Sequence, residues 1–217
     1  MQKSKRTKRL STAALLLILT ACIAVTVCTS LEIAERQSKY AEARAEYDKL
    51  RDIAIPPAEG EDEEGIDFDA LRAINPGVVG WIEVPGSRIS YPIVQGSCNR
   101  HYLHHTFSGT RNASGAIFLD YRDQLCTIHY TLSTNDPLST IRIYGHNMRD
   151  GSMFNSLLNW RGDRFIIHTP ESVMEVAVTF RGALPLTEIV AIDGGVVLVT
   201  CVNGRPDVRF VVLGEVV

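Results

Sequence analysis

The sequence lacks a basic stretch outside its first residues, contains no internal repeat, and is too short for two full domains. At 217 residues, 45% of them hydrophobic and 22% charged, it suffices for one well-packed domain and an appendage. The net charge of −3 conceals an uneven distribution, because lysine and arginine crowd residues 1–9 while acids cluster over residues 59–64. A nucleic-acid-binding domain presents a basic face, so nucleic acid is not the expected partner.

Charged residues are also missing between Leu10 and Leu31. A helix of about 22 residues covers about 33 Å, which suffices for a hydrocarbon core about 30 Å thick. By the positive-inside rule, the basic residues before this stretch stay in the cytoplasm. We therefore predict a cytoplasmic tail at 1–9, a single transmembrane signal anchor at 10–31, and an extracytoplasmic remainder of the chain.

Two other kinds of signal match part of this stretch. One is a cleaved secretory signal, and the other is a lipoprotein signal in which "LTAC" directs acylation of Cys22. In either case the mature chain normally turns polar after the processing site. Here the apolar run continues through "IAVTVCTSL", which favours the uncleaved membrane anchor.

The five cysteines divide between the apolar stretch, with Cys22 and Cys28, and the external part, with Cys98, Cys126 and Cys201. An odd external number in an oxidising compartment permits one disulfide and leaves one free thiol. The sequence does not select the pair, and three reduced thiols are the alternative.

The external part begins with a helical pattern and a linker, both within residues 32–65. The first is rich in Ala, Glu, Lys and Arg, with apolar residues near helical spacing. The segment "IPPAEGEDEEG" follows, and its prolines, glycines and acids do not sustain a helix or a core. We expect a juxtamembrane helix and an acidic linker at 32–65, followed by one domain at 66–217.

That domain consists of short β-rich runs bounded by Gly, Pro, Asn and Asp, a pattern typical of a closed barrel or a sandwich. The runs cover residues 78–84, 89–94, 115–120, 140–146, 164–169, 173–180, 196–201 and 208–214. Short helices are expected near 69–74 and 154–160. The fold class is therefore predicted to be mainly β, with an N-terminal transmembrane helix and a juxtamembrane helix before it.

Three chemically useful side chains stand at ends of these predicted strands: His146, Cys201 and Arg209. Taken singly, each is more often an ordinary surface or core residue. Cys201 and Arg209, however, are joined by one short loop, so a hairpin brings them together. A free thiol has a pKa near 8.5 and needs a neighbouring cation or proton acceptor to become a good nucleophile. The histidine and the arginine supply these, and the arginine can also donate to an oxyanion.

"YGHNM", "DGSMF", "LVTC" and "RFVVLG", in that order, resemble the sortases, which are membrane-anchored cysteine transpeptidases of Gram-positive surfaces. "INPGVVGWIEVPGSRISYPIVQG" and "YLHHTFSGTRNASGAIFLDYR" are similar to the class B branch in particular. The resemblance covers roughly Leu71 to Gly214. It implies an eight-stranded closed sortase β-barrel with short helices.

The resemblance also implies a reaction and its participants. Cys201 is then the nucleophile that cleaves a C-terminal sorting motif of secreted proteins after Thr, His146 the general acid and base, and Arg209 the group that steadies substrate and oxyanion. A thioacyl intermediate passes its acyl group to an amine of peptidoglycan or of a pilin subunit. Asn99 and Leu103 are expected to line the substrate groove, and no metal or other cofactor is required.

The sequence departs from the class B pattern in one functional region. Members generally carry a long helical insertion between the sixth and seventh strands, whereas residues 179–196 leave room only for a short loop, so the sorting motif is not predicted. His101, His104 and His105 have no carboxylate or cysteine partner at a recognised metal-ligand spacing.

Two other functions are alternatives to the transpeptidase. One is a cysteine peptidase that releases its product to water, and the other is a non-catalytic surface binding module.

Overall fold

A computed structural model describes residues 12–55, 65–123, 125 and 140–217. Several expected features fall outside these residues: the basic tail at 1–9, the start of the apolar stretch, and the acidic part of the linker. Cys126 and most of the long segment before the histidine strand also lie outside them.

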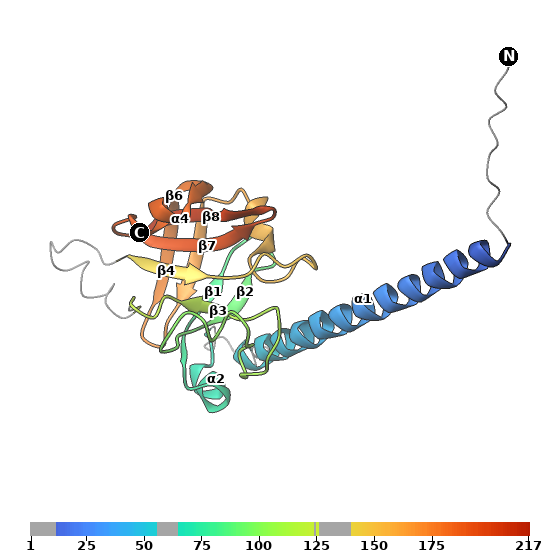
Figure 1. The fold of residues 1–217 in the computed structure, drawn as a ribbon. Helices are drawn as coiled ribbons and strands as arrows, with labels where there is room; N and C mark the ends of the chain where they lie inside the picture. Colours follow the sequence, from blue (N-terminus) through green and yellow to red (C-terminus); the bar gives the residue numbers. More distant parts are fainter. Residues whose placement is uncertain (1–11, 56–64, 124, 126–139) are drawn as a thin grey trace, which may run out of the picture. The chain divides into compact units, whose positions relative to one another are not determined.

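Eight strands close into one barrel (Figure 1), in the order β1-β2-β3-β4-β7-β8-β6-β5, with β5 pairing back onto β1. The predicted mainly-β closed barrel is confirmed, and the sandwich is excluded. Each predicted strand coincides with an observed one. The strands are β1 (Val78–Glu83), β2 (Ser90–Val94), β3 (Ile117–Leu119), β4 (Ile141–Tyr144), β5 (Arg164–His168), β6 (Val173–Pro185), β7 (Val196–Val202) and β8 (Arg205–Val216).

Strand β7 shows why the sequence has a continuous apolar run directly before the predicted nucleophile. Val196 and Leu198 belong to the main barrel core, while Val197 and Val199 pack in a second cluster with Ile189. Both faces of β7 are therefore covered, and a strand of this kind has no polar alternation. This burial fixes the strand that ends in the predicted nucleophile.

Short helices complete the barrel unit. The helix α2 (Phe68–Ile74) starts at Asp67, whose carboxylate accepts from the Ala70 N–H at 2.8 Å. A 3-10 turn, η1 (Asn155–Leu158), follows β4, and α4 (Leu186–Val190) is the helical part of the connection from β6 to β7. The expected short helices near 69–74 and 154–160 are thus present, and the β6–β7 connection is short, as the sequence indicates.

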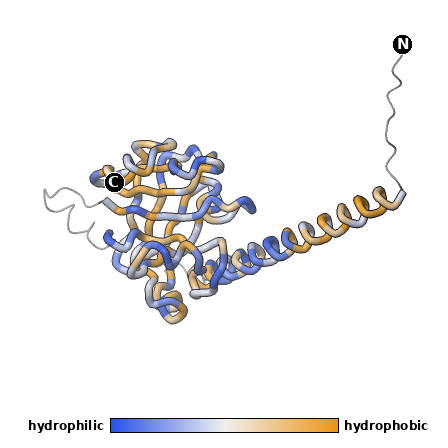
Figure 2. Tube along the Cα trace, viewed as in Figure 1, coloured by the Kyte–Doolittle hydropathy of each residue, from blue (hydrophilic) through white to orange (hydrophobic). Residues whose placement is uncertain are grey.

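The long helix α1 (Thr12–Ala54) spans 43 residues, and the chain divides into two compact units at Lys39 and Tyr40. In the first unit, the apolar side chains between Leu15 and Leu31 are exposed. Figure 2 shows that this part of the helix is hydrophobic. By its length and composition this part of the helix is able to cross a membrane. It is therefore consistent with a membrane anchor.

The second unit, Tyr40–Val217, includes the last turns of α1. Ala43, Tyr47, Leu50 and Ala54 are buried at helical spacing, so one face of these turns packs with the barrel. The division of the chain at residue 66 stays a prediction. From Tyr40 onward, the helix belongs to the same compact unit as the barrel.

Tyr47 anchors this helical segment through its hydroxyl. The hydroxyl donates to the Gly115 carbonyl at 2.7 Å and accepts from the Phe107 N–H at 3.2 Å, and the residue is 3% exposed. In Tyr47→Phe both backbone groups lose their buried partner, so we expect a loss of about 1–3 kcal/mol in the free energy of unfolding. Thermal unfolding of the detergent-solubilised chain, followed by circular dichroism, measures this loss.

Tyr40→Phe is the matched control. Tyr40 is on the same helix and packs against the same core, but its hydroxyl has no hydrogen bond within the described residues. We expect its melting temperature to stay at the wild-type value. Equal melting temperatures for both variants would contradict the role of the Tyr47 hydroxyl.

Candidate active site

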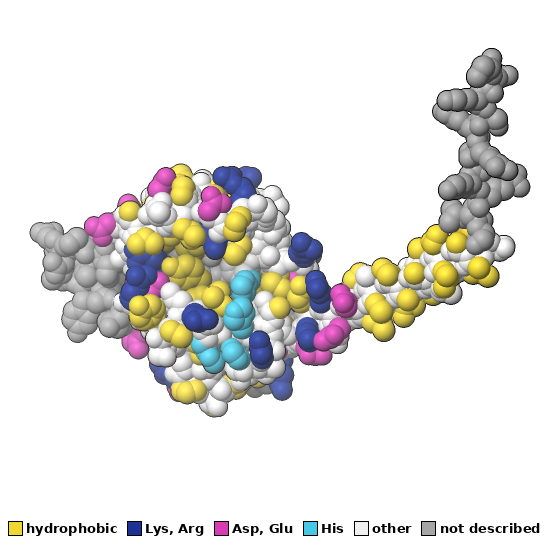
Figure 3. Space-filling view, in the orientation of Figure 1, with side chains coloured by type: hydrophobic (Ala, Val, Ile, Leu, Met, Phe, Trp, Pro, Cys, Tyr) yellow, Lys and Arg dark blue, Asp and Glu magenta, His cyan; other side chains and the backbone are white. Residues whose placement is uncertain are grey.

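A pocket of about 260 Å³ opens where β4, β7 and β8 approach their ends. It brings together all five residues predicted from the sequence: Asn99, Leu103, His146, Cys201 and Arg209. The other lining residues are Phe118, Tyr144, Gly145, Leu186, Val199 and Thr200. Figure 3 shows histidine side chains gathered on one face of the barrel unit beside apolar surface. The roles assigned to the predicted residues remain predictions.

Cys201 stands at the end of β7, after the buried Thr200, and its free thiol is half-buried. In the antiparallel ladder its cross-strand partner is Arg209 on β8. Directly opposed residues have Cβ atoms about 5 Å apart and project to the same face. The hairpin, which turns at Gly204 with φ +75°, therefore places the two residues opposite each other, and both line the pocket.

The Arg209 guanidinium is held by the hairpin itself. Its Nη1 donates to the carbonyl of Pro206 at 2.8 Å and to that of Val208 at 2.9 Å. Nε and Nη2 have no protein acceptor within the described residues. An arginine fixed at one nitrogen keeps its other donors for an anionic or carbonyl oxygen in the pocket.

His146 follows β4 through Gly145, whose N–H donates to the Val199 carbonyl of β7 at 3.1 Å. A Cβ at Gly145 would lie 2.5 Å from the Ile117 side chain, so glycine is needed for this close approach. The His146 Nε2 lies 2.9 Å from the Leu103 carbonyl oxygen. A carbonyl only accepts, so Nε2 carries the hydrogen, and the neutral imidazole has its lone pair on Nδ1.

The loop after His146 is tied to the end of β7. The Asn147 amide donates to the Cys201 carbonyl at 3.0 Å, and the Asn155 amide donates to the Asn147 side-chain oxygen at 2.7 Å. These bonds couple the histidine loop to the cysteine backbone. Neither asparagine was among the residues predicted from the sequence, although "YGHNM" places one directly after the histidine.

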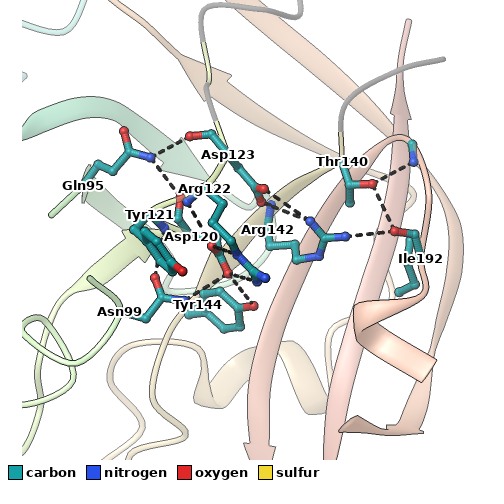
Figure 4. A network of polar contacts seen from close by, with 11 residues as sticks. Gln95, Asn99, Asp120, Tyr121, Arg122, Asp123, Thr140, Arg142, Tyr144 and Ile192 are labelled. Atoms are coloured by element: carbon teal, nitrogen blue, oxygen red, sulfur yellow. Dashed lines mark hydrogen bonds and ion pairs between the residues drawn. The ribbon is translucent and has the colours of Figure 1, made fainter. Parts of the chain in front are cut away.

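A buried carboxylate contacts two of the residues that line the pocket, Asn99 and Tyr144 (Figure 4). Asp120 accepts from the Asn99 amide at 3.0 Å, from the Tyr144 hydroxyl at 3.2 Å, and from Arg122 Nε at 2.9 Å. Burial raises the pKa of Asp120, but hydrogen bonds from Arg122 and Asn99 outweigh it and hold that pKa well below the usual range. Burial, and then the Asp120 charge, raise the pKa of Tyr144 to about 12.

Sequence reasoning also missed Asp120 and Tyr144, and each left a detectable signal. Tyr144 stands two residues before His146 at the end of a strand with alternating burial. Asp120 follows the fully buried strand β3 directly, where an unpaired carboxylate would be costly.

Three histidines lie close together in sequence near the pocket. The rings of His101 and His105 stack with centroids 4.4 Å apart. No group of three or more His, Cys, Asp or Glu side chains suited to a metal occurs among the described residues. The chemistry available in the pocket is that of a thiol, an imidazole and a guanidinium, which together suit nucleophilic acyl transfer.

Comparison with known sequences identifies two curated relatives, both described as Sortase B. The protein of Listeria monocytogenes is 36% identical over 140 residues, which are 64% of this chain and 51% of the relative. The protein of Staphylococcus aureus is 31% identical over 123 residues, 56% of this chain and 47% of the relative. The match thus spans about half the length of these relatives. No family model matches the chain.

Solved structures agree with the sequence relatives. Sortase B from B. anthracis in complex with AAEK1 has a TM-score of 0.66 and 25% identity, covering 83% of this chain and 98% of that one. A Streptococcus pyogenes class B sortase involved in pilus biogenesis has a TM-score of 0.57 and 25% identity, covering 71% and 100%. The Staphylococcus aureus sortase B-substrate complex, at 19% identity, shares the fold, with a TM-score of 0.64 and coverages of 83% and 98%.

Proposed function

We propose that this chain, which belongs with the class B sortases in sequence and in fold, acts as a membrane-anchored cysteine transpeptidase. It cleaves a C-terminal sorting motif of secreted proteins after Thr and transfers the product to an amine of peptidoglycan or of a pilin subunit. The observation that supports this most is that Cys201, His146 and Arg209 all line one pocket.

The first half of the reaction forms a thioacyl enzyme. The Cys201 sulfur attacks the Thr carbonyl carbon, and its proton moves to Nδ1 of His146, the nitrogen left open by the Leu103 contact. Negative charge develops on the carbonyl oxygen, where Nε or Nη2 of Arg209 donates to it. The C–N bond then breaks, the imidazolium returns the proton to the leaving amine, and the C–S bond remains.

The second half releases the acyl group to the acceptor. The incoming amine attacks the thioester carbonyl and gives a proton to His146, now neutral again. The C–S bond breaks as the tetrahedral intermediate collapses, and the proton returns to the Cys201 sulfur. The net result is one amide bond exchanged for another, with no oxidant or cofactor consumed.

Asn99 and Leu103 serve in this proposal as substrate-binding residues. Leu103 adds its side chain to the apolar pocket wall made with Phe118, Leu186 and Val199. Leu186 comes from α4, so the short β6–β7 connection still contributes to the groove. A pocket of this composition binds an extended peptide by apolar contact and orients it by a few polar groups.

The proposal includes a membrane arrangement, which the N-terminal segment supports. We place residues 1–9 inside the cell, residues 10–31 across the cell membrane, and the barrel outside, where secreted proteins and cell-wall amines are present. The apolar stretch of α1 is consistent with this topology. An accessibility assay that labels a single introduced cysteine in whole cells tests the orientation.

The product formed in the presence of an amine decides between transfer and hydrolysis. We expect the purified chain, given a peptide library and a diamino-acid amine, to yield aminated peptides cleaved after Thr. Mass spectrometry of the products, with and without the amine, checks this. Hydrolysed peptide in both samples would instead identify a cysteine peptidase, and a Cys201→Ala sample run in parallel excludes a contaminating activity.

A further inference from the structure

We infer that Asp120 is a positioning residue for substrate binding, because its buried carboxylate fixes two polar side chains that line the pocket, Asn99 and Tyr144. The inference rests on the proposed function and deepens it. Asp120 contacts both side chains but is absent from the pocket lining, so it acts through its two partners.

Both oxygens of the Asp120 carboxylate accept hydrogen bonds from protein donors. Its side chain is 0% exposed, and it follows β3 directly in the turn that leads to Asp123. Oδ1 accepts from the Nε and backbone N–H of Arg122, and Oδ2 accepts from Asn99, Tyr144 and Arg122 Nη2. The only charge partner among these is Arg122, whose side chain is 54% exposed. The carboxylate is therefore a fixed point around which the two pocket residues are oriented.

Asn99 is held at both ends of its carboxamide. Its Nδ2 donates to Asp120 at 3.0 Å, and its Oδ1 accepts from the Tyr121 N–H at 3.0 Å (Figure 4). This arrangement excludes the flipped amide. One Nδ2 hydrogen and one Oδ1 lone pair remain for a ligand, in fixed directions.

Tyr144 is oriented in the same way. Its hydroxyl hydrogen is directed to Asp120, which leaves the oxygen as an acceptor, and its ring stacks on Phe118 with centroids 5.3 Å apart. Asn99 and Tyr144 thus offer donors and acceptors in set positions within a largely apolar pocket. Groups of this kind recognise a peptide amide, either of the main chain or of a carboxamide side chain.

The turn that carries Asp120 is also held by Gln95, which directly follows β2. Gln95 donates to the carbonyls of Asp120 at 2.9 Å and Asp123 at 2.6 Å. The Asp123 carboxylate accepts from the Arg142 N–H at 2.8 Å, and Arg142 Nη2 donates to the Ile192 carbonyl at 2.9 Å. Asp123 therefore offers a control: it is an acid in the same turn with a side chain only 8% exposed, and within the described residues its carboxylate makes no hydrogen bond to a side chain that lines the pocket.

The test compares Asp120→Asn with Asp123→Asn in the full chain, using the peptide selected from the library. A neutral carboxamide at position 120 has the same shape as the carboxylate. It places an N–H donor opposite the Asn99 and Tyr144 donors, so these two side chains lose their common acceptor. We expect KM for the peptide to rise about tenfold with kcat little changed. Asp123→Asn is expected to lower the melting temperature but to leave KM at the wild-type value. Alkylation of Cys201 by iodoacetamide should proceed at the wild-type rate in both.

A thermodynamic cycle separates positioning from general destabilisation. If Asp120 acts through its partners, adding Asn99→Ala and Tyr144→Phe to Asp120→Asn should raise KM little further. Additive effects, an unchanged KM in Asp120→Asn, or an equal rise in Asp123→Asn would each overturn the inference.

A readout without turnover keeps the inference apart from the proposed function. In the ligand-free chain, the side-chain amide resonances of Asn99 should shift and exchange faster in Asp120→Asn but not in Asp123→Asn. Unchanged resonances would overturn the inference even if transpeptidation is observed. Absence of product from the wild-type chain, with these resonances shifted as expected, would instead reject the proposed function alone.

Discussion

Cys201→Ala is expected to reduce formation of the aminated peptide by about 10⁴-fold or more, with little change in the melting temperature. The sulfur is the atom that carries the acyl group in the proposed reaction, and nothing else in the pocket lining is a comparable nucleophile. The side chain is small and half-buried at the end of β7, so its replacement leaves the strand register intact. Product formation by mass spectrometry and thermal unfolding, on the same preparation, measure both effects.

Cys98→Ala is the matched control, because Cys98 is also a free thiol but is exposed and does not line the pocket. We expect it to retain wild-type activity. Loss of activity in Cys98→Ala together with retention in Cys201→Ala would place the nucleophile elsewhere. Full peptide processing by Cys201→Ala would favour the alternative of a barrel that binds without catalysis.

The strands were predictable because apolar runs and turn residues are local signals. Their ends were less so: β6 continues to Pro185 instead of ending near Phe180, and β8 starts at Arg205 instead of Val208. The extra residues of β6 pair with β8, as in the register of Pro185 with Val208, and not with residues near them in sequence. The length of such an extension depends on the partner strand, and the local sequence pattern does not reveal which strand is the partner.

The helix α1 shows the same limit. The sequence predicts an apolar span and an amphipathic helix, and no helix-breaking residue separates them before Pro56, so one continuous helix results. That its last turns are buried is a tertiary property. It results from contacts with segments far away in sequence, among them the loop carbonyl of Gly115, which accepts from Tyr47.

The candidate site divides in a similar way. Cys201 and Arg209 were placed together from sequence because one hairpin joins them, and the ladder pairs them directly. Asp120 was not found, because its effect on the pocket passes through Asn99 and Tyr144, which come from two other segments. Residues that bear the chemistry are recognisable by type, whereas those that orient them are recognisable only by contact.

His146→Gln is expected to lower kcat for transfer by about 10²- to 10⁴-fold, the usual contribution of a general acid and base. Glutamine is the chosen replacement because its side-chain amide can still donate to the Leu103 carbonyl, as Nε2 of the imidazole does at 2.9 Å. It has no basic nitrogen to take the thiol proton or to protonate the leaving amine. Because the carbonyl contact and the pocket wall are kept, KM for the peptide should change little.

His104→Gln provides the comparison, since His104 is exposed and outside the pocket lining. Single-turnover kinetics of both variants separate formation of the thioacyl enzyme from its transfer to the amine. Both steps should slow in His146→Gln, because the same imidazole accepts a proton in each. If only the transfer step slows, a different group deprotonates Cys201, and the assignment of Nδ1 as the acceptor of the thiol proton fails.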